Sequence, residues 1–318
     1  MQFPSEDVLR GKQLAFLVGA PRSGTTWLQL ILSRSPSVVT AQETDLFNVF
    51  LHPMVEEWNR YRKTGVPVCL SEVLAEEEFR TLLHHISGFV FAKIAQAKPC
   101  ASVVLEKTPN HINCWREILD LWPDSHFVHI IRDPRAVVAS RRAAVKNWGR
   151  EHDWGSPRIS MITEAWISFV SNGRQIRSAT QNYQEVLYEE LMSNGPAVLM
   201  RVFGKLGVAS NLDECYRYVD ECSMQNLKSA KLDAAPFDLA KAGPYRFRIG
   251  STEGWRRELS ASEIALVERL AGPLMADLAY ERAARSKLAA AHGELLYTVE
   301  RARRKAAKWL RSRLGQDC

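Results

Sequence analysis

The sequence lacks the patterns that would hold a metal ion, build a disulfide framework or cross a membrane. Its cysteines form no C-x-x-C pair and no metal-ligand spacing. No apolar run approaches the length of a membrane span, and the opening MQFPSEDVLRGK has no signal-peptide core. We therefore expect reduced thiols, no metal site and a cytoplasmic location. The cysteines are Cys69, Cys100, Cys114, Cys215, Cys222 and Cys318.

The sequence also has little excess charge. It has 318 residues, and its 42 basic and 36 acidic side chains give a net charge of +6. A hydrophobic fraction of 46% is typical of a globular protein, and this length can form one large α/β domain or two modest ones. The small positive charge suits an anionic ligand without identifying one.

Apolar segments typical of buried strands alternate with segments of helical periodicity. This alternation predicts an α/β fold, a P-loop-type parallel sheet with helices on both faces. Ligands of such sheets bind beyond the carboxyl ends of the strands. The expected domain covers 1–285, followed by a helical tail over 286–318. Strands are expected over 14–20, 102–108, 126–134 and 185–191, and helices over 25–34, 71–86, 111–121, 158–182, 195–206 and from 262 onward.

The loop after the first expected strand lacks a lysine. Gly19 to Thr26 (GAPRSGTT) matches the phosphate-binding frame G-x-x-x-x-G-K-[ST], except that Thr25 stands in the lysine position. Gly19 and Gly24 permit the tight turn, and the loop amides with the following helix N-terminus form an anion site. The side chains of Arg22, Ser23, Thr25 and Thr26 add donors. We expect an anion that carries less charge than a metal-bound triphosphate.

A second candidate anion site follows the third expected strand. In IIRDPRAVVASRR, Arg132 leaves the strand end, and Ser140 lies on the helix that Asp133 and Pro134 are placed to start. An arginine and a hydroxyl near a helix N-terminus would hold a second phosphate. Two separate anion sites predict a ligand with two anionic groups.

These motifs resemble those of the PAPS-dependent sulfotransferases. PRSGTTW, which ends at Trp27, is similar to their 5′-phosphosulfate loop, and IRDPRAVVAS to their 3′-phosphate motif. The resemblance implies 3′-phosphoadenosine 5′-phosphosulfate as donor, adenosine 3′,5′-bisphosphate as product, and no metal. It further implies donor-binding roles for residues in LYEELMSNG, CSMQNLK and RIGSTEGWRREL. These residues are Tyr188, Ser223, Met224, Arg248, Ile249 and Gly250.

Two residues compete as the base that takes the proton of the acceptor. Glu43 has the spacing from the P-loop of the catalytic glutamate of tyrosylprotein sulfotransferases, which this region resembles. Other relatives use a histidine in K-x-H, but here Pro109 occupies that place and the first histidine is His111. Arg22 and Lys107 are the candidates that stabilise the leaving phosphate. Glu43 is preferred, and His111 remains the alternative.

Two other functions are compatible with the loop. A P-loop kinase or NTPase would use Asp133 of VHIIRD to bind Mg²⁺, although the missing lysine weighs against it. A nucleotide-binding module without turnover would keep the loop, although Arg22, Lys107 and Glu43 together favour an enzyme.

The acceptor is a hydroxyl compound whose class stays open between a sugar, a lipid, a phenol and a peptide. Residues 46–100 and 147–157 match no donor motif and are expected to line its site. The candidate aromatic side chains there are Phe47, Phe50, Trp148 and Trp154.

The tail is expected to form a basic amphipathic helix. Residues 300–318 contain seven lysines and arginines against Glu300 and Asp317, and apolar residues recur at steps of three to four from Leu288 to Leu310. Three interpretations remain: a solvated helix packed on the domain, a peripheral contact with a membrane that inserts Trp309 and Leu310, and self-association. No nucleic-acid partner is expected.

Overall fold

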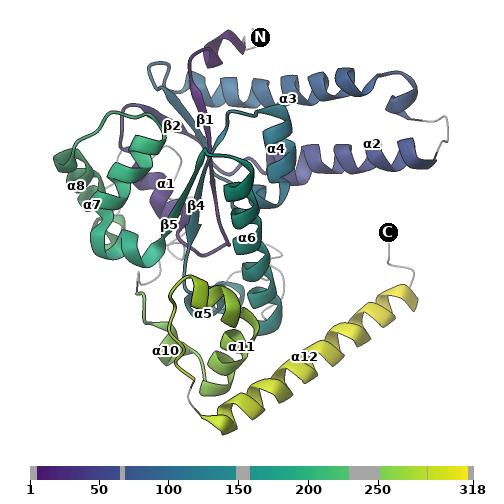
Figure 1. The fold of residues 1–318 in the computed structure, drawn as a ribbon, viewed down its shortest axis with the longest axis vertical. Coiled ribbons are helices and arrows are strands. Elements are labelled where there is room, and N and C mark those ends of the chain that lie inside the picture. The colour runs from purple at the N-terminus through teal and green to yellow at the C-terminus, as the bar shows by residue number, and fades with distance from the viewer. Residues whose placement is uncertain (1–5, 65–68, 148–157, 229–250, 285, 314–318) are drawn as a thin grey trace. The chain divides into compact units, whose positions relative to one another are not determined.

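The computed structural model describes residues 6–64, 69–147, 158–228, 251–284 and 286–313. The chain groups into two units. The first unit comprises residues 1–131 and 171–248, and the second comprises residues 132–170 and 249–318. Each is described by itself, and Figure 1 labels the elements of both.

The first unit is built on a parallel sheet of five strands in the order β2-β3-β1-β4-β5. The sheet and its helices confirm the expected α/β class. The strands are β1 (Gln13–Val18), β2 (Val38–Thr40), β3 (Val103–Glu106), β4 (His126–Ile131) and β5 (Tyr183–Leu187). The helical elements of this unit are η1 (Glu6–Leu9), α1 (Thr25–Ser33), η2 (Leu46–Leu51), α2 (His52–Thr64), η3 (Leu70–Glu72), α3 (Glu76–Gln96), η4 (Pro109–Cys114), α4 (Trp115–Leu121), α7 (Tyr188–Lys205), α8 (Leu212–Glu221) and α9 (Met224–Lys228).

Side chains of β1 alternate between two hydrophobic layers, because successive residues of a strand point to opposite faces. Ala15 and Leu17 join the core formed with α1, α7 and α8, which lie together beside the sheet in Figure 1. Phe16 points to the opposite face. The centroid of its ring lies 5.6–5.8 Å from those of Phe47, Phe91 and Phe127. The central strand is therefore buried on both faces, which explains its continuous apolar sequence.

Several predicted boundaries needed correction. The helix expected over 195–206 begins at Tyr188, directly after β5, because Asn194 and Pro196 only kink it. The expected helix over 111–121 is a 3₁₀ turn followed by α4. The strand β2 and the helices α2 and α8 were not predicted; β2 has only three residues, too few for a periodic signal.

The second unit is helical. It contains α5 (Pro134–Asn147), residues 159–170 of α6 (Ile159–Ala179), α10 (Trp255–Glu258), α11 (Ala261–Asp277) and α12 (Lys287–Arg313). Asp133 caps α5 as expected, since its Oδ1 accepts from the Arg135 N–H at 2.8 Å. Across the described ranges, no helix is both long and apolar enough to span a bilayer.

The tail helix α12 packs on its neighbours in this unit. The buried Glu300 carboxylate accepts from the backbone N–H groups of Ile159 and Ser160 at 3.2 and 2.9 Å, which caps the N-terminus of α6. Gly293 lies so close to α11 that a Cβ there would come within 3.0 Å of the Ser262 carbonyl oxygen. The domain boundary at 285 stays a prediction, but this part of α12 is not an isolated helix.

The P-loop turn depends on glycine, which leads to a first testable prediction. Gly24 has φ +99°, and a Cβ there would lie 2.6 Å from the Tyr188 ring. Gly204, in the regular helix α7, meets nothing within 4 Å. Gly24→Ala should lower the free energy of unfolding by about 1–3 kcal/mol, while Gly204→Ala should raise it by about 0.4–1 kcal/mol.

Urea denaturation of both variants beside the unmodified protein measures these changes. Equal effects at the two positions would contradict a steric requirement at Gly24.

Candidate active site

The loop between β1 and α1 presents donors without a side-chain cap. Gly24 is the N-cap of α1 and supplies no side-chain hydrogen bond, so the first N–H groups of the helix keep their capacity for an anion. Arg22 has φ +79°, a left-handed conformation that is costly outside glycine and is concentrated at functional sites. Ser23 is fully buried, and its Oγ makes no hydrogen bond to any described residue. These features fit a bound anion.

Lys107 places a second cation, besides Arg22, next to the loop helix. It directly follows β3, its side chain is only 1% exposed, and its ammonium forms an ion pair with the Glu43 carboxylate. The same Nζ lies 3.4 Å from the hydroxyl of Thr26 in the first turn of α1. The structure thus brings three predicted residues together, from the loop helix, the end of β3 and the segment after β2. Glu43 keeps a side chain that is 36% exposed.

Glu106, the residue before Lys107, anchors a separate network on the opposite face of β3. Its Oε1 accepts from the hydroxyls of Thr108 at 2.7 Å and Thr44 at 2.8 Å, and its Oε2 lies 2.8 Å from His111 Nδ1. Burial alone raises the pKa of Glu106, but His111 and the two hydroxyl donors lower it, and the net pKa lies below its ordinary value. Glu106 is therefore a buried carboxylate.

The two ring nitrogens of the buried His111 differ in their contacts: Nε2 accepts a hydrogen bond, whereas Nδ1 lies 2.8 Å from Glu106 Oε2 without the angle of a full hydrogen bond. Nε2 accepts from the Phe47 N–H at 3.1 Å, so the single proton of a neutral ring lies on Nδ1, facing Glu106. Phe47 itself is fully buried against the His111 ring, which corrects its expected place in an acceptor wall. Phe50 is 59% exposed and remains a candidate there.

Two further donor-binding candidates, Tyr188 and Ser223, lie near the first turn of α1, which contains Trp27. The Trp27 indole donates to the Cys222 carbonyl at 2.8 Å, and its ring lies 5.7 Å from the buried ring of Tyr188. Ser223 follows Cys222, and its Oγ accepts from the Asn226 N–H at 3.4 Å. Tyr188 thus packs against the loop glycine and Trp27. The side chain of Met224 lies outside the described residues, as do Arg248, Ile249 and Gly250 and the acceptor candidates Trp148 and Trp154.

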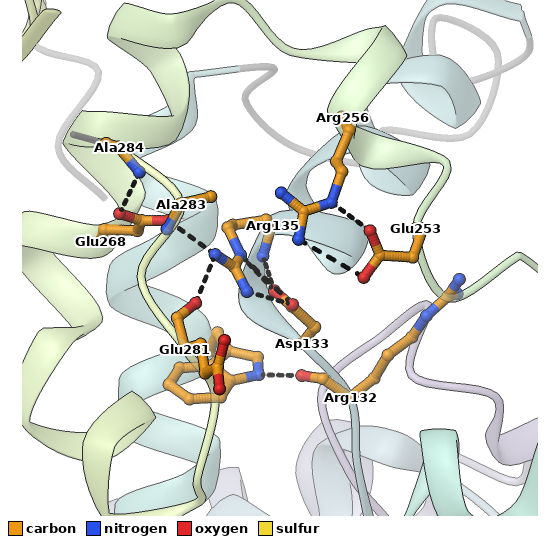
Figure 2. A network of polar contacts seen from close by, with 10 residues as sticks. Arg132, Asp133, Arg135, Glu253, Arg256, Glu268, Glu281, Ala283 and Ala284 are labelled. Carbon is orange, nitrogen blue, oxygen red and sulfur yellow. Dashed lines mark hydrogen bonds and ion pairs between the residues drawn. The ribbon is translucent and has the colours of Figure 1, made fainter. Parts of the chain in front are cut away.

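In the second unit, Arg132 contacts one of the later motifs. Its Nη2 donates to the Ser251 carbonyl at 2.9 Å. Its own carbonyl accepts from the Trp166 indole at 2.9 Å, the dashed line at Arg132 in Figure 2. The segments RDPR and STEGWRRE are therefore adjacent within this unit, as the resemblance implies. Ser140 lies on α5, half-buried.

Arg135 holds these segments in place. Its guanidinium pairs with Asp133 at 2.7 Å and Glu268 at 2.6 Å (Figure 2). It also stacks 4.0 Å from the Trp255 ring. Burial on its own lowers the pKa of Arg135, but the two carboxylates raise it overall. Because Asp133 caps α5 and neutralises Arg135, its contacts do not support the Mg²⁺ role of a kinase. Among the residues that the structure describes, no cluster of His, Cys, Asp and Glu could hold a metal.

The sequence reasoning missed Glu106, Thr44 and Thr108. It assigned no role to Glu106, which follows strand residue Leu105 and precedes Lys107, and the structure pairs Lys107 with Glu43. Strand alternation was the available signal, because adjacent residues at the end of β3 must point to opposite faces.

Comparisons with known proteins relate the chain to one family. A family model described as "Sulfotransferase family" matches residues 15–212. The nodulation protein NoeE of Sinorhizobium fredii is 24% identical over 313 residues, which cover 87% of this chain and 68% of that protein. The omega-hydroxy-beta-dihydromenaquinone-9 sulfotransferase Stf3 of Mycobacterium bovis is 28% identical over 144 residues, 43% of this chain. That match spans only 34% of Stf3, and a match to the protein-tyrosine sulfotransferase of Drosophila melanogaster spans 25% of that protein.

Solved structures share the fold. Mouse sulfotransferase SULT7A1, complexed with PAP, has a TM-score of 0.54 at 15% identity, and the match covers 93% of this chain and 95% of that one. The sulfotransferase domain from the curacin biosynthetic pathway has a TM-score of 0.51 at 16% identity, covering 86% and 99%.

Proposed function

Because this chain belongs to the sulfotransferase family, we propose that it transfers a sulfuryl group from 3′-phosphoadenosine 5′-phosphosulfate to a hydroxyl of an acceptor. The observation that carries this proposal is the buried Lys107 beside Thr26 and Glu43. This arrangement offers a cation and a carboxylate next to an anion-binding loop. The mouse structure with PAP, the product that remains of this donor, supports the nucleotide assignment.

Each residue has a role that follows from its position. The acceptor oxygen forms a bond to sulfur while the bond between sulfur and the phosphate oxygen of the donor breaks. The acceptor O–H bond breaks in the same reaction. Glu43, the more exposed partner, takes the proton. Lys107 and Arg22 stabilise the charge that develops on the leaving phosphate. Gly24, Ser23, Thr25 and Thr26 hold the 5′ end of the donor.

The contacts of both His111 nitrogens within the protein support Glu43 as the base. We assign the 3′-phosphate to Arg132 and Ser140, and to Arg248, Ile249 and Gly250 beyond the described residues. Trp27, Tyr188, Ser223 and Met224 are assigned to the adenosine.

The donor assignment predicts selectivity for a nucleotide with two phosphate positions. Calorimetry should show adenosine 3′,5′-bisphosphate binding far more tightly than AMP or ATP, with no change on adding EDTA. Arg132→Ala should weaken the binding of the bisphosphate by about 1.5–3 kcal/mol, the scale of a hydrogen bond to a charged group. The binding of AMP should stay unchanged. Tight, Mg²⁺-dependent ATP binding would contradict the proposal, and equal losses for both nucleotides would show that Arg132 is structural.

The base assignment predicts a loss of turnover without a loss of donor binding. Glu43→Gln keeps an acceptor for the Lys107 ammonium but removes the basic carboxylate. Turnover with a phenolic or alcohol acceptor should fall by about 10²–10⁴-fold at unchanged bisphosphate affinity. The matched control is Glu77→Gln, because the Glu77 side chain is 82% exposed and should leave turnover unchanged. Full turnover in Glu43→Gln would remove Glu43 from the mechanism.

For α12 we propose peripheral contact with an anionic membrane surface. Leu288, Leu295 and Val299 are 66%, 62% and 39% exposed, and their spacing of four and seven residues places them on one face. Arg301, Arg303 and Lys305 follow them and are exposed. Apolar side chains beside cations suit an anionic lipid interface better than a second copy with the same charge. This contact would bring the enzyme to an acceptor in the membrane, and Stf3 is named for an omega-hydroxy-dihydromenaquinone.

Co-sedimentation with vesicles tests the contact. The unmodified protein should bind vesicles of phosphatidylglycerol but not of phosphatidylcholine, and salt should weaken the binding. The triple variant Leu288→Ser, Leu295→Ser and Val299→Ser should abolish the binding. The double variant Arg301→Glu and Arg303→Glu should abolish it as well. The control variant Val73→Ser should keep the vesicle binding, because Val73 is 78% exposed but does not lie on α12. Glu300 and Arg304 are kept, since they tie α12 to α6. Absence of vesicle binding by the unmodified protein would overturn the membrane assignment. A molar mass by light scattering that falls only in the Leu288, Leu295 and Val299 variant would overturn it too and would indicate self-association.

A further inference from the structure

We infer that Glu106 is a positioning residue that fixes the Glu43 segment against Lys107 through Thr44 and His111. The inference rests on the proposed function and deepens it. Glu106 and Lys107 are consecutive residues at the end of β3 and are both buried, 2% and 1% exposed. Strand alternation sends Lys107 to the face of α1 and Glu106 to the face of η2 and η4. One peptide bond thus joins the proposed catalytic cation to the anchor of the segment that carries its partner.

The first arm of the anchor holds the residue next to Glu43. Thr44 donates to Glu106 Oε1 from its hydroxyl at 2.8 Å and from its backbone N–H at 3.3 Å. Thr108, bonded to the same Oε1, accepts from the N–H groups of Thr44 and Asp45 at 3.2 and 3.3 Å. Asp45 has φ +50°, a left-handed backbone conformation that is costly for a residue other than glycine. These hydrogen bonds stabilise the backbone in that conformation.

The second arm runs through His111 and depends on its tautomer. Because Nε2 accepts the Phe47 N–H, the proton of a neutral His111 ring lies on Nδ1, and the Glu106 Oε2 carboxylate oxygen, 2.8 Å away although without the angle of a full hydrogen bond, favours it there. Nε2 then carries a lone pair, which accepts a hydrogen bond from the Phe47 N–H at 3.1 Å. The Phe47 ring is in turn buried against Phe16 of the central strand. The segment from Thr44 to Phe47 is therefore clamped at both ends by one carboxylate.

This clamp gives His111 a role other than that of the base. His111 acts on the reaction through the backbone that carries Glu43, and it touches no reacting atom. A shift of about 1 Å at a reacting group can cost on the order of 10²-fold in rate, which gives selection a physical reason to keep such an anchor rigid.

Thr44→Val is the sharpest test, because valine keeps the shape and removes only the hydroxyl. We expect kcat to fall by about 10- to 100-fold at unchanged affinity for adenosine 3′,5′-bisphosphate. The Tm should fall as well, because the buried Glu106 carboxylate loses a donor. Thr44→Ser keeps the hydroxyl and should restore kcat. Thr163→Val is the matched control: it removes a buried hydroxyl that bonds only within its own helix, at 2.8 Å to the Ile159 carbonyl, and should leave kcat unchanged.

A second variant reads the tautomer without any turnover. In Glu106→Gln the amide brings an N–H₂ donor either to His111 Nδ1 or to the Thr44 donors, and each orientation breaks one arm. The ¹⁵N chemical shifts of His111 should report a proton on Nδ1 in the unmodified protein and a change of that state in Glu106→Gln. In kcat, Thr44→Val and Glu106→Gln should be non-additive when combined, because they act through one network.

The outcomes separate this inference from the proposed function. An unmodified protein that transfers no sulfuryl group contradicts the function. An active protein in which Thr44→Val keeps full kcat, or in which His111 carries its proton on Nε2, overturns the positioning role. A loss of kcat in Thr44→Val that Thr44→Ser does not restore also overturns it.

Discussion

Two consecutive buried charges at the end of β3 are the constraint on which the rest of the first unit depends. Burying a carboxylate or an ammonium costs several kcal/mol unless partners satisfy it, so Glu106 and Lys107 dictate what must surround them. Lys107 requires the Glu43 carboxylate, and Glu106 requires the hydroxyls of Thr44 and Thr108 and the ring of His111. Because Glu43 and Thr44 are also consecutive, two adjacent pairs face each other across the strand end. Neither pair can move without leaving a buried charge unsatisfied.

The same pattern explains how a phosphate-binding loop works without its lysine. In the usual loop the cation lies on the helix that binds the phosphates, whereas here it comes from the neighbouring strand and lies 3.4 Å from the Thr26 hydroxyl. A lysine held by a strand end has less freedom than one on an exposed loop, and its carboxylate partner is supplied by a third segment. The proposed cation and base are thus held by contacts within the protein, which suits electrostatic preorganisation.

Much of this could be predicted from the sequence. The strand, the glycine-bounded turn and the helix behind it follow from local rules, and the positive φ of Gly24 confirms why glycine stands there. Asp133 as a cap was predictable for the same reason. The three-residue strand β2, by contrast, pairs with β3 through contacts distant in sequence and carries no periodic signal. Phe47 could not be assigned to the core from its neighbours alone, because its burial depends on Phe16 and Phe91, which come from other elements.

The candidate site shows where such reasoning stops. Sequence rules identified Glu43, Lys107 and His111 as chemically able residues, but each could act in two ways, and only partners decide between them. His111 is an ordinary candidate base until both of its nitrogens are seen to face partners within the protein, and Glu106 looks like a trivial neighbour of Lys107 until alternation separates them. In the second unit, Asp133 has the position of a metal ligand, yet Arg135 and the helix N-terminus already use its oxygens. The chemistry of a side chain is set by which of its lone pairs and protons the fold leaves available, and that depends on tertiary contacts.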